Sequence, residues 1–123
     1  MARVVLYHNP KCSKSRGALE LLQGAAAELE VVEYLHSPLS RSELETLLAQ
    51  LGGSPSGLVR KDKHFAELGL DPDDYAEVGP VADILAEHPR LMERPVAVSG
   101  GRAVIGRPPE RVLELLEGSS PAN

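Results

Sequence analysis

The first third of the chain shows a β-type run, a helical stripe and a second β-type run. Residues 3–7, RVVLY, are rich in β-formers, and Asn9-Pro10 breaks this run. From about residue 13 to residue 23 the apolar positions recur at helical spacing. Residues 30–34, EVVEY, predict a second strand. A strand–helix–strand unit of this length predicts a parallel pair joined by a right-handed crossover.

The middle of the chain has helical periodicity throughout. Ser40 and Glu43 stand at the spacing of a capping box, in front of a leucine-rich helix. Residues 54–68 predict further short helical pieces, and residues 77–88 carry one apolar stripe that ends before a proline. Residues of about 40–89 are therefore expected to form an all-helical block.

After this block the pattern returns to strands. PVAV at 95–98 and RAVI at 102–105 predict a hairpin whose turn, SGG, carries the glycines. A last helix follows, and residues 119–123 are expected to be a disordered tail. The whole order is β-α-β, helical insert, β-β-α, within a single domain of residues 1–118. It predicts an α/β fold of the thioredoxin-like class, a four-stranded mixed sheet flanked by helices.

Composition narrows the function classes. The 123 residues carry a net charge of −5 and contain three Tyr, one Phe and no Trp, which argues against nucleic-acid or anionic-membrane binding. No apolar run approaches the roughly 18 residues that span a bilayer. A single cysteine fits a reducing compartment. We therefore expect a cytoplasmic monomer, and one cysteine without close histidine pairs predicts no metal site.

That cysteine, Cys12, lies at the predicted start of the first helix. The orphan amides and the positive dipole end there favour an anion and lower a thiol pKa, in documented cases to roughly 3.5–7.5. Lys11, Lys14 and Arg16 add positive charge nearby, and His8 could donate to the sulfur or to its partner. The position predicts a reactive thiolate rather than an inert core residue.

Other polar side chains near Cys12 can form hydrogen bonds to the sulfur or to the loop. The hydroxyls of Ser13 and Ser15 could donate hydrogen bonds to a thiolate. His8 has an alternative role, in which it only caps a strand or hydrogen-bonds the loop.

Three arginines stand beside breaks in regular structure: Arg60 in LVRK, Arg94 in ERPV and Arg107 in GRPPE. Each alone is an ordinary surface charge. In a thioredoxin-like fold, however, a cis-proline typically precedes the third strand and faces the active cysteine, so Arg94-Pro95 would lie opposite Cys12. Three guanidiniums around a thiolate would form a site for a tetrahedral oxyanion.

These stretches together resemble a known family. YHNPKCSKSR, LVRK, ERPVAV and GRPPERVLELL extend over about residues 4–116, and the chain resembles short members of the glutathione/glutaredoxin-dependent arsenate reductases. The resemblance implies a thioredoxin-like fold in which Cys12 attacks arsenate. It implies that Arg60, Arg94 and Arg107 bind the oxyanion and that His8 helps keep the thiol ionised.

The resemblance also implies the partners. Glutathione is the co-substrate that attacks the thiol–arsenate adduct, glutaredoxin completes the reduction, and arsenite is released, with no bound cofactor. The substrate would be arsenate or a related oxyanion. The expected supporting residues are Asn9, Ser15, Arg16 and Pro95.

Two other functions fit the same residues. Ser13-Lys14 replaces the Gly-Thr that family members more often carry, and the chain ends without their longer extension. A glutathione-linked redox or anion-binding protein without arsenate turnover is one alternative. The other is a redox-responsive regulator of the same fold, but Ser15 stands where such regulators carry the second cysteine of a CxxC switch.

Overall fold

The computed structural model describes residues 3–25 and 28–118 and divides the chain into two compact units. Residues 1–37 and 94–123 form one, called the sheet unit below, and residues 38–93 form the other, called the helical unit. The predicted insert of about residues 40–89 falls inside the helical unit. The predicted disordered tail, 119–123, lies outside the described residues. No helix in the described ranges is long and apolar enough to cross a membrane.

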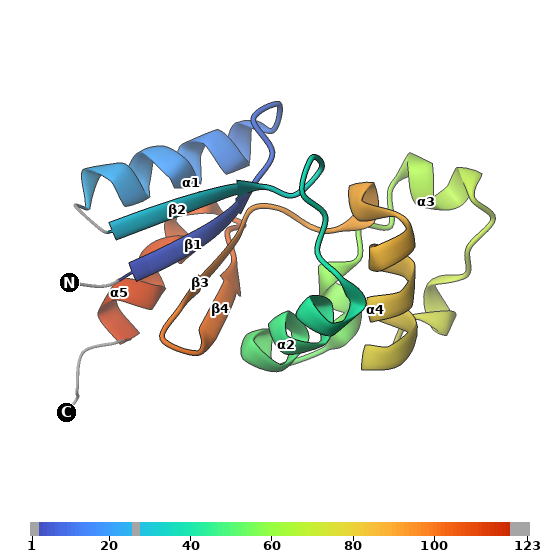
Figure 1. Ribbon diagram of the computed structural model, residues 1–123. Coiled ribbons are helices and arrows are strands. Elements are labelled where there is room, and N and C mark those ends of the chain that lie inside the picture. The colour runs from blue at the N-terminus through green and yellow to red at the C-terminus, as the bar shows by residue number, and fades with distance from the viewer. Residues whose placement is uncertain (1–2, 26–27, 119–123) are drawn as a thin grey trace. The chain divides into compact units, whose positions relative to one another are not determined.

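The described residues of the sheet unit form four strands, two α-helices and one 3₁₀ helix, and Figure 1 shows how these are arranged. In chain order these are β1 (Arg3–His8), α1 (Ser13–Gly24), β2 (Glu28–Glu33), β3 (Val96–Ser99), β4 (Arg102–Ile105), the 3₁₀ helix η4 (Pro109–Leu113) and α5 (Glu114–Gly118). The strand order is β2-β1-β3-β4, with β1 parallel to β2 and antiparallel to β3. The predicted mixed sheet of the thioredoxin-like class is confirmed.

Several strand ends differ from the prediction by one or two residues, and so does the start of the last helix. β2 begins at Glu28 rather than at residue 30, because it pairs with the full length of β1, from Arg3 opposite Glu28 to His8 opposite Glu33. The last helix begins as the 3₁₀ helix η4 and becomes α-helical only at Glu114.

One face of the sheet is covered by α1, η4 and α5. Along β1 the side chains of Val4 and Leu6 are fully buried, as period-2 alternation requires. They pack against helical residues and against the neighbouring strands in a core of Val4, Leu6, Ala18, Leu22, Ala97, Val104, Val112 and Leu115. This core fixes the first turn of α1 beyond the end of β1 (Figure 1).

The helical unit is built from short elements. These are α2 (Arg41–Leu51), η1 (Pro55–Leu58), α3 (Lys63–Glu67), η2 (Pro72–Asp74), α4 (Val78–Glu87) and η3 (Pro89–Leu91). The predicted capping box is confirmed: the Glu43 amide donates to Ser40 Oγ at 3.1 Å, and the Ser40 amide donates to Glu43 Oε1 at 2.8 Å. Arg41 of α2 forms ion pairs with Glu45 and with Asp83 of α4.

Pro95 packs tightly against Gly106, which follows β4. The Arg94–Pro95 peptide bond is cis, as expected from the sequence, and the Gly106 amide donates to the Pro95 carbonyl at 2.8 Å. A Cβ atom at Gly106 would lie 2.8 Å from Pro95 Cγ and 3.0 Å from Val112 Cγ1. Only glycine therefore allows this approach, which places the backbone of Arg94 and Arg107 side by side.

Gly106→Ala should lower the free energy of unfolding by about 1–3 kcal/mol, because the added methyl overpacks the contact with Pro95 and Val112. Gly24→Ala is the matched control, since nothing lies within 4 Å of a Cβ at Gly24. Urea denaturation of both variants measures the difference. Equal stability of the two would show that the Pro95 contact is not constraining.

Candidate active site

Cys12 occupies the N-cap position of α1. Its backbone is extended, with φ −98° and ψ 124°, and its side chain is partly buried. The Cys12 amide donates to the Asn9 carbonyl at 3.0 Å, and the Cys12 carbonyl accepts from the Arg16 amide at 3.0 Å. The loop therefore closes on itself and continues directly into the helix. This backbone turns the first amides of α1 toward the sulfur.

The sulfur is surrounded by hydrogen-bond donors. Arg107 Nη2 donates to it at 3.9 Å, and the backbone amides of Ser15 and Lys14 and the side chain of Arg94 favour its anionic form. Burial raises the pKa of the Cys12 thiol and is the largest single effect. The Ser15 amide, the Arg94 guanidinium and the Lys14 amide together outweigh it, so that the pKa is lowered overall. The anion is stabilised by helix-terminal amides and by a guanidinium.

Arg94 and Arg107 both lie beside the Cys12 sulfur, and a hydrogen bond joins the two arginines. Arg107 Nε donates to the Arg94 carbonyl at 2.9 Å, which fixes the Arg107 side chain across the start of β3. Each arginine precedes a cis-proline, Pro95 and Pro108 respectively. The structure thus brings Cys12, Arg94 and Arg107 to one place, as the sequence predicted, although the three are up to 95 positions apart in the chain.

His8 contacts Ser15. His8 Nδ1 lies 2.6 Å from Ser15 Oγ, and the Asn9 amide donates to the same oxygen at 3.0 Å. Ser15 is fully buried, and His8 is 4% exposed. A hydroxyl can donate once and accept twice, so Ser15 serves both partners. The hydroxyl predicted to donate to the thiolate is therefore directed to His8 and Asn9, and Ser15 reaches the sulfur through its backbone amide instead.

The pKa of the His8 ring is lowered from its ordinary value. Burial lowers its pKa most strongly; Glu33, its neighbour on β2, acts in the opposite direction, and Arg16 lowers the pKa further. A neutral imidazole adds no positive charge beside Cys12. The contact of His8 with the Ser15 hydroxyl fits a positioning role, and the part of His8 in keeping the thiol ionised stays a prediction.

The remaining supporting residues fasten the loop. Asn9 Oδ1 accepts from the Lys11 amide at 3.0 Å, and Arg16 Nη1 donates to the Pro10 carbonyl at 2.9 Å. Asn9 therefore forms hydrogen bonds to the loop and to α1 through its side chain, its backbone amide and its carbonyl. The short loop is held at several points along its length.

Arg60 belongs to the helical unit. Its Nε lies 3.3 Å from Asp62 Oδ2 and its Nη1 lies 3.4 Å from Glu93 Oε1, with the side chain 22% exposed. Its amide donates to the Leu91 carbonyl at 2.7 Å. Its place in the oxyanion site stays a prediction.

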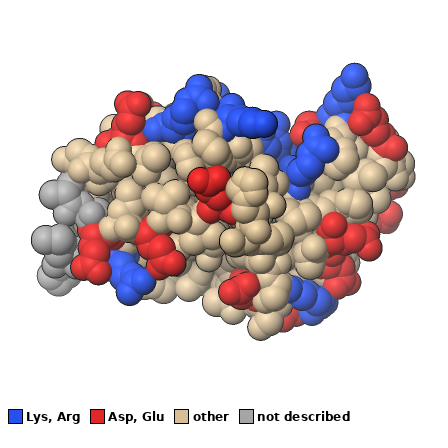
Figure 2. Space-filling model, turned by 45° about the horizontal axis from the view of Figure 1, so that its top comes forward, with Lys and Arg blue, Asp and Glu red and all other residues tan. Residues whose placement is uncertain are grey.

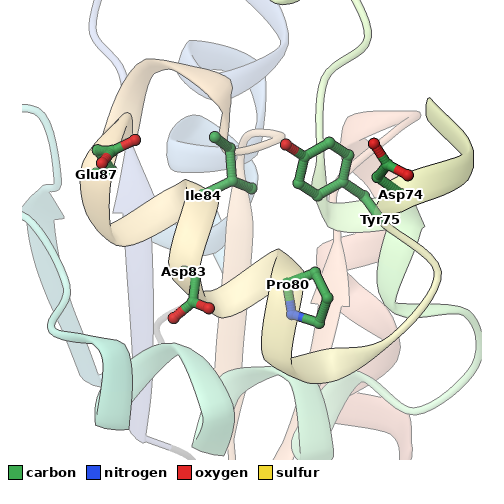
Figure 3. A pocket seen from close by; sticks show the side chains of 6 residues that line it. All are labelled: Asp74, Tyr75, Pro80, Asp83, Ile84 and Glu87. Carbon is green, nitrogen blue, oxygen red and sulfur yellow. The ribbon is translucent and has the colours of Figure 1, made fainter. Parts of the chain in front are cut away.

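A pocket of about 350 Å³ lies within the helical unit (Figure 3). It is lined by Asp74, Tyr75, Pro80, Asp83, Ile84 and Glu87. Three carboxylates would repel an oxyanion, so this pocket does not suit the predicted substrate. Within residues 3–25 and 28–118, no group of three or more His, Cys, Asp or Glu side chains could hold a metal ion.

Sequence reasoning missed two features of the site. Gly106 is a close-contact residue, and its only signal was a lone glycine directly after a predicted strand. The route from His8 through Ser15 to the sulfur needs tertiary geometry, because a hydroxyl and an amide of the same residue point to different partners.

Comparison with known proteins identifies the class. The pattern that defines the ArsC family matches residues 7–115. An arsenate reductase of Neisseria meningitidis is 41% identical over 118 residues, which is 94% of this chain and 100% of that protein.

Solved structures agree with this assignment. The arsenate reductase from Vibrio cholerae superposes with a TM-score of 0.80 at 40% identity, over 93% of this chain and 98% of that one. A putative arsenate reductase from Yersinia pestis superposes with a TM-score of 0.82 at 42% identity, over 90% and 98%. The fold and site define a thioredoxin-like protein with one activated cysteine. The chain belongs to the ArsC family.

Alkylation of Cys12 should follow the lowered thiol pKa. Because the folded state favours the thiolate, the alkylation rate should rise with a midpoint below the ordinary value of about 8.5, and in urea the midpoint should return to that value. The stability gained from the thiolate is then present at high pH and is lost as pH falls through the folded pKa. Iodoacetamide rates against pH measure both midpoints, and identical midpoints would contradict the stabilisation.

Ser15→Ala should lower the free energy of unfolding by about 1–3 kcal/mol, because it leaves the buried Asn9 amide and His8 ring without their shared partner. Ser13→Ala is the matched control, since Ser13 is exposed in the same turn of α1. Denaturant titration compares the two. Equal stability of the variants would show that the Ser15 hydroxyl is not structurally important.

Proposed function

We propose that the protein is an arsenate reductase that takes its electrons from glutathione and glutaredoxin. The observation that carries this proposal is the Cys12 sulfur, which sits among two helix amides, Arg94 and Arg107. A nucleophile is thereby placed where an oxyanion would be bound. The names of the ArsC relatives from Neisseria and Vibrio support arsenate as the oxyanion.

The arginines supply binding and charge stabilisation. A guanidinium presents five N–H donors in a planar fork, which suits the paired oxygens of a tetrahedral oxyanion. Arg94 and Arg107 would hold arsenate beside the sulfur, and Arg60 is proposed as the third cation. As the Cys12 thiolate attacks arsenic, one arsenate oxygen takes up protons and leaves as water. The same guanidiniums stabilise the charge on the remaining oxygens.

The electrons must come from outside the chain. Reduction of arsenate to arsenite needs two electrons, which two thiols supply by forming one disulfide, and the chain has one cysteine. Glutathione is proposed to attack the Cys12 adduct and glutaredoxin to complete the reduction. Cys12 is regenerated and arsenite and water are released. The cytoplasm is the proposed compartment, because small thiols are kept reduced there.

A coupled assay tests this function. With arsenate, glutathione, glutaredoxin, glutathione reductase and NADPH, we expect arsenate-dependent NADPH oxidation that Cys12→Ser abolishes. Arg94→Ala should lower kcat/KM by about 10²–10³-fold, the usual effect of removing one preorganised charge-stabilising donor.

Arg102→Ala is the control for loss of an arginine. It is exposed, and it starts β4 opposite Ser99, at the hairpin end of the sheet rather than at the Pro95 end. It should keep wild-type kcat/KM. Arsenate-dependent oxidation by the wild-type protein that does not exceed the Cys12→Ser background would reject the arsenate proposal.

A further inference from the structure

Two lysines flank the reactive cysteine in the chain. Lys11 directly precedes Cys12 and Lys14 lies in the first turn of α1, and both side chains are exposed. Figure 2 shows basic side chains gathered over the start of α1 and the loop before it. This local charge contrasts with the net charge of −5 of the whole chain. A basic patch on an acidic protein raises the local concentration of anions.

The backbone of both lysines is fixed close to the sulfur. The Lys11 amide donates to Asn9 Oδ1, and Lys14 lies in the first turn of α1, where its amide helps to lower the pKa of Cys12. Within residues 3–25 and 28–118, neither ammonium group forms an ion pair with a carboxylate. Arg16 differs, because its guanidinium is bound to the Pro10 carbonyl. The two lysine charges therefore extend into solvent from rigid positions on either side of Cys12.

The basic groups around Cys12 form an inner and an outer set. Arg94 and Arg107 are partly buried and reach the sulfur, so they serve a small oxyanion bonded to it. Lys11 and Lys14 are exposed and have no contact with the sulfur through their side chains among the described residues. Their charges suit a larger anion. In such an anion the carboxylates lie several bonds away from the atom that reacts at Cys12.

We propose that Lys11 and Lys14 steer an anionic thiol, one that carries carboxylates remote from its sulfur, to Cys12. The inference deepens the proposed function, because the single cysteine requires an external thiol. The lysines raise the rate at which the anionic thiol reaches Cys12, so their effect is electrostatic and long-ranged. It should weaken with salt, since the screening length falls from about 30 Å at 0.01 M to about 3 Å at 1 M.

The test compares two disulfide probes that differ in charge. The Cys12 thiolate attacks one sulfur of the disulfide and forms a mixed disulfide. The other half leaves as a thiolate, which the pyridyl probe converts to 2-thiopyridone by taking up a proton, and the absorbance of the released group gives the rate. 5,5′-Dithiobis(2-nitrobenzoate) is the anionic probe and 2,2′-dithiodipyridine is the neutral one. The ratio of the two rate constants cancels any change in the pKa or nucleophilicity of Cys12.

In the double variant Lys11→Gln/Lys14→Gln, the anionic-to-neutral rate ratio should fall about three- to tenfold at 0.01 M ionic strength, as expected for loss of two nearby charges. At about 0.5 M salt the ratio should match that of the wild-type protein, because the charges are screened.

Arg3→Gln/Arg102→Gln is the matched control. It removes the same formal charge from exposed positions at the other end of the sheet, where β1 and β4 begin. Its rate ratio should stay at the wild-type value. An unchanged ratio in the lysine variant, or an equal fall in the control, would overturn the proposal.

The outcome is independent of arsenate, which the assay does not contain. Arsenate turnover together with an unchanged probe ratio would overturn the steering role and leave the reductase function standing. A ratio that falls only in the lysine variant would support the steering role even if arsenate turnover failed.

Discussion

A partly buried anion is the constraint on which this site depends. The Cys12 sulfur loses hydration where it lies, and that loss by itself favours the protonated thiol. The protein compensates with dipoles and charge that are already oriented: the amides of Ser15 and Lys14 and the guanidinium of Arg94. Because these donors are fixed before any ligand arrives, they require no reorganisation when charge develops at the sulfur.

The packing of the sheet unit holds those donors in place. β1 and α1, packed through Leu6, Ala18 and Leu22, set the helix start beyond the strand end. From the other half of the sheet unit, the contact between Pro95 and Gly106 sets the backbone from which Arg94 and Arg107 project. The helix start at Cys12 and the segments that carry Arg94 and Arg107 thus meet at the Cys12 sulfur. The register of the sheet determines how closely they approach.

His8 is linked to the cysteine through Ser15. A protonated histidine would stabilise the thiolate by charge, but the pKa of His8 is lowered by burial, and its ring contacts Ser15. The buried hydroxyl, shared by His8 and the Asn9 amide, orients the residue whose own amide faces the sulfur. Positive charge at the site comes from the guanidiniums of Arg94 and Arg107.

The sequence by itself determined the features that depend on interactions between near neighbours in the chain. The alternation in β1, the Ser40–Glu43 capping box and the helix start after Cys12 depend on near neighbours, and the structure has them where the pattern predicted. Tertiary structure decided what depends on long-range geometry. It shows that the Ser15 hydroxyl turns to His8, and that Gly106 must lack a side chain because Pro95 lies against it. Such contacts depend on packing and on strand register between residues that are distant in the chain. The pattern of residue types along the sequence does not predict them.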